Sequence, residues 1–207
     1  MPTKRTKVKR LPKLATYDRP EINAILDEAI VCHIGFESDG QPYATPSLHA
    51  RVGDVLYLHG SQASRMMRNL ASGAPCCVTV TLVDGVVLAR RAFNQAINYR
   101  CVMVLGTAVA VEEPAEKLAA LEALTNQLVP GRWEQTKPPS RQELKATMIL
   151  RMPIDETSAK VRVGEPTSHD EDLPEWSRTW AGVLPITQQV GEPIPIKALP
   201  NDVEVPA

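Results

Sequence analysis

The sequence lacks several features that would place it in a broad functional class. Its 23 basic and 24 acidic side chains nearly cancel, so no overall positive field points to nucleic acid as a partner. No apolar run approaches the roughly 20 residues that a membrane-spanning helix needs. The basic segment from Lys4 to Lys13 contains no apolar stretch of the kind that follows the charges of a secretory signal. These absences predict a cytoplasmic protein with neither a membrane nor a nucleic-acid partner.

Familiar catalytic and metal-binding patterns are absent as well. No Ser-His-Asp spacing, Gly-rich nucleotide loop or paired-carboxylate motif stands out. His33 and His49 have no carboxylate or cysteine at ligand spacing, so no metal site is predicted. The spacing of the cysteines fits no common zinc pattern, and we expect reduced, mostly buried thiols at Cys32, Cys76, Cys77 and Cys101.

What the sequence does contain is a series of short β-prone runs separated by turn residues. Of its 207 residues, 43% are apolar, which is enough for one domain with a full core plus an extension. Asp39-Gly40 and Asp84-Gly85 are typical of hairpin turns. The runs predict a mainly β fold, a six-stranded antiparallel barrel with peripheral helices, and the clearest of those helices is expected over 114–129.

Composition divides the chain into three segments. Residues 1–18 are expected to form a basic, irregular arm, and residues 19–163 the barrel domain. Residues 164–207 are rich in proline and are expected to form an extension, with one helical turn near Trp176 and an extended arm after Pro185. Pro46 falls inside an expected strand, so that strand should be locally unpaired or bulged there, because proline cannot donate a ladder hydrogen bond.

Residues 55–81 predict a strand, a polar loop, a short helix and another strand. The loop carries Ser61 and Ser64, and Arg65 follows at the start of the helix. Hydroxyl groups, free backbone N–H groups and a guanidinium together are suited to holding a phosphate. The alternative interpretation is that the serines only cap the helix and that Arg65 is a surface cation.

The order of these elements resembles the pyridoxamine 5′-phosphate oxidase-like family of FMN-binding split barrels. The segments that carry the resemblance are YLHGSQASRM, CCVTV and NYRCVMVLGTAVAVEE, in that order, over about residues 19–163. The resemblance is strongest to the branch of flavin-nucleotide-binding proteins related to nitroimidazole-resistance reductases, and the tail WAGVLPI is also similar to that branch. It implies a homodimer with FMN at the subunit interface.

The resemblance also implies which residues contact the flavin. One strand would line the ring, the end of the next strand would lie beside it, the helix start would hold the phosphate, and the long strand would complete the site. The matching positions are Thr45, Pro46, Ser47 and Leu48; His59 and Gly60; Ser64 and Arg65; and Arg100 and Cys101. Ser61 is a further candidate because of its place in the polar loop. Met66 stands where the family often has a second cation, and Cys101 stands in place of a glutamine.

These features predict an FMN-dependent oxidoreductase that acts on a small acceptor. The C-terminal Trp–Arg signature of true pyridoxamine-phosphate oxidases is not present, which argues against pyridoxamine phosphate as the substrate. No catalytic residue is assigned, and the substrate and the electron donor stay open. The alternatives are a non-catalytic flavin- or haem-binding store or sensor, with His59 as the candidate axial ligand, and a purely structural dimer, which Met66 would favour.

Overall fold

A computed structural model describes residues 2–166, 174–198, 200 and 203. The helices are α1 (Arg19–Glu28), α2 (Arg65–Ala71), α3 (Pro114–Leu128) and α4 (Arg141–Ala146), with short 3-10 turns at Pro12–Leu14, Ala92–Asn94, Trp133–Gln135 and Pro174–Trp176. The strands are β1 (Ala15–Thr16), β2 (Val31–Ser38), β3 (Gln41–Val52), β4 (Val55–Ser61), β5 (Pro75–Leu88), β6 (Ala96–Thr107), β7 (Val109–Ala110), β8 (Thr147–Pro153), β9 (Glu156–Arg162) and β10 (Gly182–Pro185).

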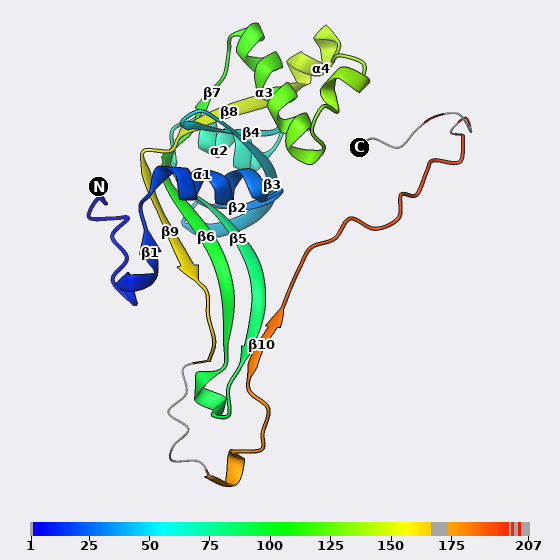
Figure 1. Cartoon of the computed structure of the whole chain (residues 1–207). Helices are drawn as coiled ribbons and strands as arrows, with labels where there is room; N and C mark the ends of the chain where they lie inside the picture. The colour runs from blue at the N-terminus through cyan, green and yellow to red at the C-terminus, as the bar shows by residue number, and fades with distance from the viewer. Residues whose placement is uncertain (1, 167–173, 199, 201–202, 204–207) are drawn as a thin grey trace.

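The strands form one antiparallel sheet in the order β1-β9-β6-β5-β2-β3-β4-β8-β7, with β10 added beside β5. Figure 1 shows this sheet curling around α1 and α2, while the β5–β6 hairpin runs out of the barrel as a long arm. The predicted mainly β, antiparallel fold is therefore confirmed. The sheet has ten strands where six were expected, and three of the ten, β1, β7 and β10, are only two to four residues long.

Several local predictions hold because the sequence signals act over short distances. The β2–β3 turn places Asp39 and Gly40 at φ 55° and 77°, the positive values that such hairpins require. Asp18 caps α1 by accepting a hydrogen bond from the Glu21 backbone N–H. The predicted helix over 114–129 is α3, which ends at Leu128.

The predicted turn at Asp84-Gly85 is wrong. β5 continues through both residues, with an irregularity in its register against β6 between Val83 and Gly85. β10 pairs with the same stretch and comes so close that a Cβ on Gly85 would lie 3.0 Å from the Leu184 carbonyl oxygen. The glycine therefore serves close strand packing rather than a turn.

Pro46 was expected to leave its strand locally unpaired or bulged, and on the edge that faces β2 the strand is neither. β2 and β3 pair without a register shift from Val31↔Leu48 to Ser38↔Gln41, and Pro46 lies opposite His33 within that ladder. The other edge of β3 pairs with β4 only from His49 onward. The proline thus lies where one edge of its strand has no partner, as expected for this residue.

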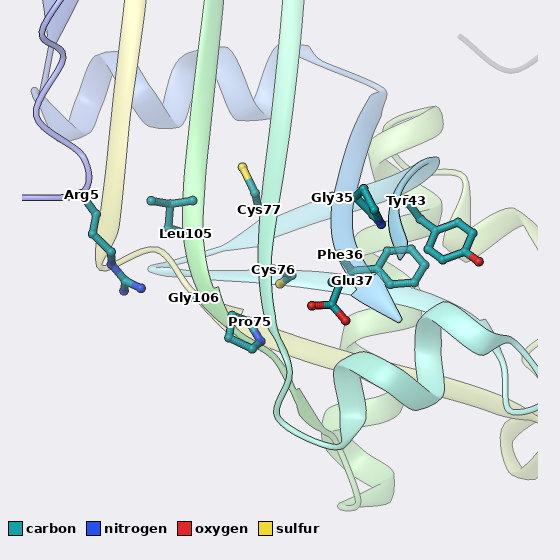
Figure 2. A pocket seen from close by; sticks show the side chains of 11 residues that line it. Arg5, Gly35, Phe36, Glu37, Tyr43, Pro75, Cys76, Cys77, Leu105 and Gly106 are labelled. Atoms are coloured by element: carbon teal, nitrogen blue, oxygen red, sulfur yellow. The ribbon is translucent and has the colours of Figure 1, made fainter. Parts of the chain in front are cut away.

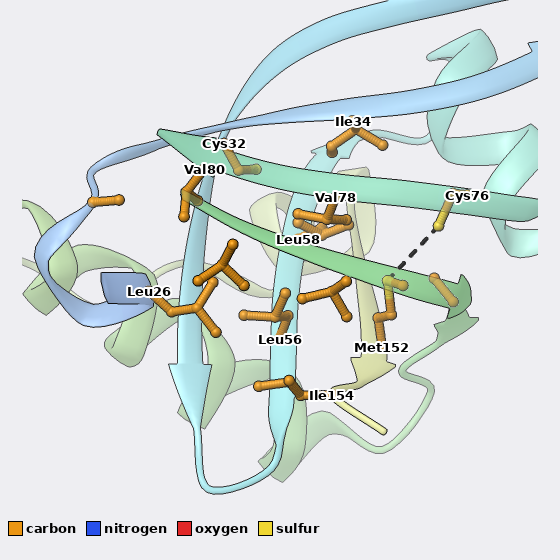
Figure 3. Close-up of a cluster of buried hydrophobic side chains, with 14 of the residues drawn as sticks. Leu26, Cys32, Ile34, Leu56, Leu58, Cys76, Val78, Val80, Met152 and Ile154 are labelled. Carbon is orange, nitrogen blue, oxygen red and sulfur yellow. Dashed lines mark hydrogen bonds between the residues drawn. The ribbon is translucent and has the colours of Figure 1, made fainter. Parts of the chain in front are cut away.

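The main core fills the barrel and draws on the helices as well as the strands. Figure 3 shows Leu56 and Leu58 of β4 facing Val78, Val80 and other apolar side chains across the interior. The Cys76 thiol contacts the Met152 sulfur at 3.7 Å. A second cluster forms outside the barrel, where α3 covers parts of β3 and β8.

The cysteines agree with the prediction of free thiols. Cys32 and Cys76 are buried, and Cys77 and Cys101 are partly buried. Burial raises the pKa of the Cys32 thiol to about 12 and that of Cys76 to about 11. All four are therefore protonated near neutral pH.

The N-terminal segment is less irregular than expected. β1 pairs with β9, Thr6 is buried, and the Tyr17 hydroxyl accepts a hydrogen bond from the Val8 backbone N–H. Within the described residues, no helix has the length and apolar character needed to cross a membrane.

The described parts of the C-terminal extension lie along the arm and then leave it. The expected helical turn near Trp176 is a 3-10 turn, and β10, which the sequence did not predict, pairs with β5. Residues 186–198 then run as an extended segment away from the barrel (Figure 1). Val190 and Ile194 there are almost fully exposed. Residues 167–173, 199, 201–202 and 204–207 of the predicted extension lie outside the described part.

Arg100 joins the base of the arm to helix α1. Its guanidinium donates two hydrogen bonds to the Asp84 carboxylate and two to the Glu28 carboxylate. The hydrogen bond from Arg100 holds the pKa of Glu28 below its ordinary value of 4.5. Asp84, which resembles a turn residue in the sequence, is thus held within β5 by an ion pair.

This clamp predicts a specific loss of acid stability. A carboxyl whose pKa is lower in the folded state contributes stability above its unfolded pKa and loses it as pH falls through the folded pKa. In Arg100→Gln that contribution disappears, so urea midpoints of wild type and variant should differ at pH 7 and converge as pH falls through the lowered pKa of Glu28. Arg151→Gln is the control, because Arg151 is exposed and lies 3.8 Å from Glu116. A constant difference between wild type and Arg100→Gln across this range would contradict the clamp.

Candidate functional site

The candidate site lies where the barrel is open between β3 and β4. β3 and β4 pair only through His49↔Leu58 to Val52↔Val55. Before His49, β3 pairs with β2 alone, and the end of β4 from His59 to Ser61 pairs with β8. Helix α2 follows β4 directly, so the loop before α2 and the first half of β3 border the same opening.

The four predicted positions on β3 divide between the two faces of the strand. Thr45 and Ser47 lie opposite Ile34 and Cys32, which are fully buried, so they share the inner face. Pro46 and Leu48 lie on the outer face, and Leu48 packs against the cluster under α3. Thr45 and Ser47 are therefore the two polar side chains that this stretch directs to the inner side of the opening.

The serines on the opposite border hold the loop and the helix start in place. Ser64 caps α2 by accepting a hydrogen bond from the Met67 backbone N–H at 3.4 Å. The Ser61 hydroxyl accepts from the Ala63 backbone N–H at 3.2 Å. Both hydroxyls still have a hydrogen to donate. The capping and ligand-binding interpretations are thus compatible.

Arg65 crosses the opening from α2 to β3. It is exposed, its Nη1 donates to the Tyr43 hydroxyl at 2.6 Å, and its guanidinium lies 5.1 Å from the centre of the Tyr43 ring. The Tyr43 ring in turn stacks on Phe36, with centroids 5.3 Å apart. Sequence reasoning missed Tyr43, although its place two residues before Thr45 puts both side chains on one face of the strand.

The structure explains why position 60 is a glycine and why position 66 is apolar. A Cβ on Gly60 would lie 2.7 Å from Cγ of Met67, so a side chain there would displace α2 from β4. Met66, at the position where the related family often has a cation, packs its side chain against the main core. A lysine there would have to leave its methylene chain in the core and bring its amine out to solvent.

His59 presents a partly buried imidazole at the end of β4. Burial lowers the pKa of His59, so the ring is neutral at pH 7. Its Nδ1 is buried and has no hydrogen-bond partner among the described residues. His49 also has an unpartnered Nδ1, but it is fully enclosed and its Nε2 lies 3.0 Å from the Leu26 carbonyl oxygen. Of the two, His59 is the partly exposed one, and it lies at the end of β4 beyond the pairing with β3.

Arg100 and Cys101 lie away from this opening. They belong to β6, which is separated from β3 by β5 and β2. Arg100 is engaged by Asp84 and Glu28, and Cys101 pairs with Thr81 and Lys160. Within one chain the structure therefore brings together the predicted residues of β3, β4 and α2, and leaves these two apart. The roles of all these residues as flavin ligands stay predictions.

Two solved structures are similar to this chain over almost its whole length. One is the flavocytochrome Anf3 from Azotobacter vinelandii, with 40% identity, 99% of this chain and 94% of that chain covered, and a TM-score of 0.91. The other is described as the FAD and heme binding protein from Mycobacterium smegmatis, with 36% identity, 93% and 94% coverage and a TM-score of 0.87.

A more distant structure shares the fold alone. It is a Bacteroides thetaiotaomicron protein assigned to 5-nitroimidazole antibiotic resistance, at 22% identity, covering 71% of this chain and 86% of that chain with a TM-score of 0.60. No match was found among curated protein sequences.

The sequence profile of a family described as pyridoxamine 5′-phosphate oxidase matches residues 18–161. That range contains all of the sheet except β1 at its start, the last residue of β9 and β10 at its end. With the barrel, its opening and these relatives in agreement, the chain belongs to the pyridoxamine 5′-phosphate oxidase family.

Proposed function

We propose that the protein binds a flavin at the opening between β3 and β4 and acts as a flavin-dependent oxidoreductase. The observation that carries this proposal is Arg65, an exposed guanidinium beside Ser61 and Ser64 whose one hydrogen-bond acceptor among the described residues is the neutral Tyr43 hydroxyl. Its charge is therefore available to a phosphate. FMN, the expected cofactor, and the FMN half of FAD carry this phosphate alike.

Each bordering residue has a role in this proposal. Arg65 binds the phosphate, with the Ser61 and Ser64 hydroxyls as further donors. Thr45 and Ser47 orient the ring from β3, and His59 is a neutral group near it. When bound, the flavin takes a hydride or two electrons from a reductant and passes them to a small acceptor. The protein groups bind and orient, which fits the lack of an evident general base in the sequence.

Removing the Arg65 charge should weaken flavin binding without affecting the fold. A hydrogen bond to a charged group contributes about 1.5–3 kcal/mol, so Arg65→Ala should raise the Kd for FMN roughly 10- to 150-fold. Calorimetric titration measures this Kd, and NAD(P)H oxidation with quinone or nitro acceptors should fall in parallel at limiting flavin.

Arg68→Ala is the matched control, because it removes an exposed arginine from the same helix. Its Kd should stay within about twofold of wild type, a difference of less than 0.5 kcal/mol. An unchanged Kd in Arg65→Ala would mean that the phosphate binds elsewhere. Tight flavin binding without turnover of any acceptor would leave a binding module instead of an enzyme.

We also propose that the protein works as a homodimer. The outer face of β2 and β5 carries Val31 and Val83, which are 48% and 41% exposed, among small side chains such as Thr81. The arm exposes more apolar surface, including Phe93 at its tip, which is 96% exposed. A two-fold related copy would cover these surfaces, because such an interface uses the same patch twice. Cys101, which lies opposite Thr81, would then border a site shared between subunits, whereas Arg100 lies opposite Leu82 on the other face of β6.

A charge on the outer face should separate the subunits. Thr81→Arg places an unpaired guanidinium in the proposed interface, where its desolvation is unfavourable, so light scattering on a sizing column should report a monomer. Glu122→Arg, on the exposed side of α3, should leave the dimer intact. A monomeric wild type, or a dimeric Thr81→Arg, would contradict this interface.

Haem is a second cofactor that a specific observation favours. His59 at the end of β4 has an Nδ1 without a partner among the described residues, and neutral histidine is a common axial ligand of haem iron. The flavocytochrome and the FAD and heme binding protein, both more than 35% identical, support this candidate. Within the described residues, no group of three or more His, Cys, Asp or Glu side chains could hold a bare metal ion.

His59 as an axial ligand predicts a selective spectral loss. Wild-type protein mixed with haemin should develop a Soret band shifted from that of free haemin, and His59→Ala should lose the shift while retaining flavin. His33→Ala, on an exposed strand position, is the control and should keep the band. Retention of the band in His59→Ala with loss in His33→Ala would reassign the ligand.

A further inference from the structure

A groove of about 450 Å³ lies at the ends of β2, β5 and β6. Gly35, Cys77 and Leu105 lie side by side on these paired strands and form its floor (Figure 2). Because Val78, next to Cys77, is buried in the barrel, the floor belongs to the outer face of the sheet. Thr81, in the proposed homodimer interface, lies on the same face of β5. The groove therefore continues the surface that a second copy would cover.

The two ends of the groove carry opposite charges. Arg5 lies at one end, where its guanidinium pairs with Glu156 and stays largely exposed. Glu37 borders the groove toward the other end, beside the rings of Phe36 and Tyr43 (Figure 2). Its carboxylate accepts one hydrogen bond, from a backbone N–H at 2.8 Å, and its second oxygen has no partner among the described residues. The groove thus runs from a cation, over an apolar floor, to a carboxylate and two stacked rings.

Residues 186–198, which we call the Pro-rich segment, have apolar side chains that their own chain leaves uncovered. Val190 is 96% exposed and Ile196 is 73% exposed. Pro193 and Pro195 favour the polyproline II conformation, which has three residues per turn. In that conformation Val190, Pro193 and Ile196 lie on one face of the segment. The segment therefore presents an apolar strip with nothing packed against it.

We propose that the groove of one subunit binds the Pro-rich segment of the other, so that each subunit of the homodimer is held by the segment of its partner. Aromatic-lined grooves are a recurrent binding site for Pro-rich segments. β10 pairs with β5 as far as Gly85, and the chain then leaves the barrel, so a second copy supplies the segment (Figure 1). This inference rests on the proposed homodimer and adds a second contact to it.

The groove and the segment agree in length and in charge. The row of paired residues from Glu156 to Gly35 crosses four adjacent strands, which is about 14 Å at roughly 4.8 Å per spacing. The stretch from Glu192 to Lys197 spans about 15 Å at roughly 3.1 Å per residue. Its carboxylate then meets the cationic end of the groove, and its amine meets the carboxylate end. Ile196 lies above Gly35, which has no side chain to occupy that space.

A disulfide between subunits tests this arrangement. Ile196→Cys places a thiol above the floor, and oxidised glutathione at about pH 8.5 should link it to Cys77 of the other subunit. The alkaline pH is needed because burial raises the pKa of the Cys77 thiol. Non-reducing electrophoresis of the full chain should show a covalent dimer, which the double variant with Cys77→Ser should not form. Gln188→Cys is the matched control, because it is exposed in the same segment but precedes the stretch that enters the groove.

The affinity between subunits gives a second measurement that does not depend on oxidation. Ile196→Asp brings a charge onto the apolar floor, so the dissociation constant of the dimer should rise roughly tenfold or more in a sedimentation dilution series. Gln188→Asp should stay within about twofold of wild type. Both positions are exposed in the single chain, so neither substitution should alter the fold.

Three results would overturn the inference and leave the homodimer standing. They are a disulfide that peptide mapping places within one chain, a covalent dimer that persists in the double variant, and a dimeric Ile196→Cys that forms no link. An unchanged dimer affinity in Ile196→Asp would contradict it as well. A monomeric wild type would overturn the proposed homodimer itself, and this inference with it.

Discussion

The candidate site depends on one constraint: from Gln41 to Leu48, strand β3 has a partner on only one edge. If β4 paired along the whole of β3, the barrel would be closed there and Thr45 and Ser47 would face only the core. Pro46 helps to keep that edge free, because a residue without an N–H cannot complete a second ladder. Pro46, which weakens the pairing of its strand, thus helps to keep the barrel open.

Helix α2 occupies the space that the missing pairing leaves. It can approach because Gly60 has no side chain: any Cβ there would collide with Met67, which is fully buried. The close approach also turns Met66 toward the core and leaves Arg65 at the rim. The missing second cation, which the sequence alone suggests is a weakness of the phosphate site, therefore follows from how the helix packs.

Much of the fold could be predicted from the sequence because its signals are local. Asp39-Gly40 specifies a hairpin, Asp18 caps a helix, and the order of strands and helices carries the family resemblance. β10 could not be predicted, because a four-residue strand among prolines forms only where β5 offers it an edge. Tyr43 was missed for a similar reason: its role appears only when α2 brings Arg65 across the opening.

Asp84-Gly85 shows how tertiary contacts can override a strong local signal. Alone, the pair favours a turn, but here Asp84 is bound by Arg100 and Gly85 makes room for β10. The two interactions hold the stretch extended, and the arm exists because of it. A sequence pattern cannot anticipate this, since Arg100 lies 16 residues after Asp84 and β10 lies about 100 residues after Gly85.

The two arginines singled out from the sequence end in opposite electrostatic situations. Arg100 donates four of its five N–H groups to two carboxylates, so its charge is already compensated and a phosphate would have to compete with Asp84 and Glu28. Arg65 has no acidic partner among the described residues, only the neutral Tyr43 hydroxyl and ring. An anion entering the opening therefore meets the uncompensated guanidinium of Arg65, whereas Arg100 lies away from the opening with its charge neutralised. Both residues are candidates from the sequence, and their different partners favour Arg65 over Arg100 as the proposed phosphate ligand.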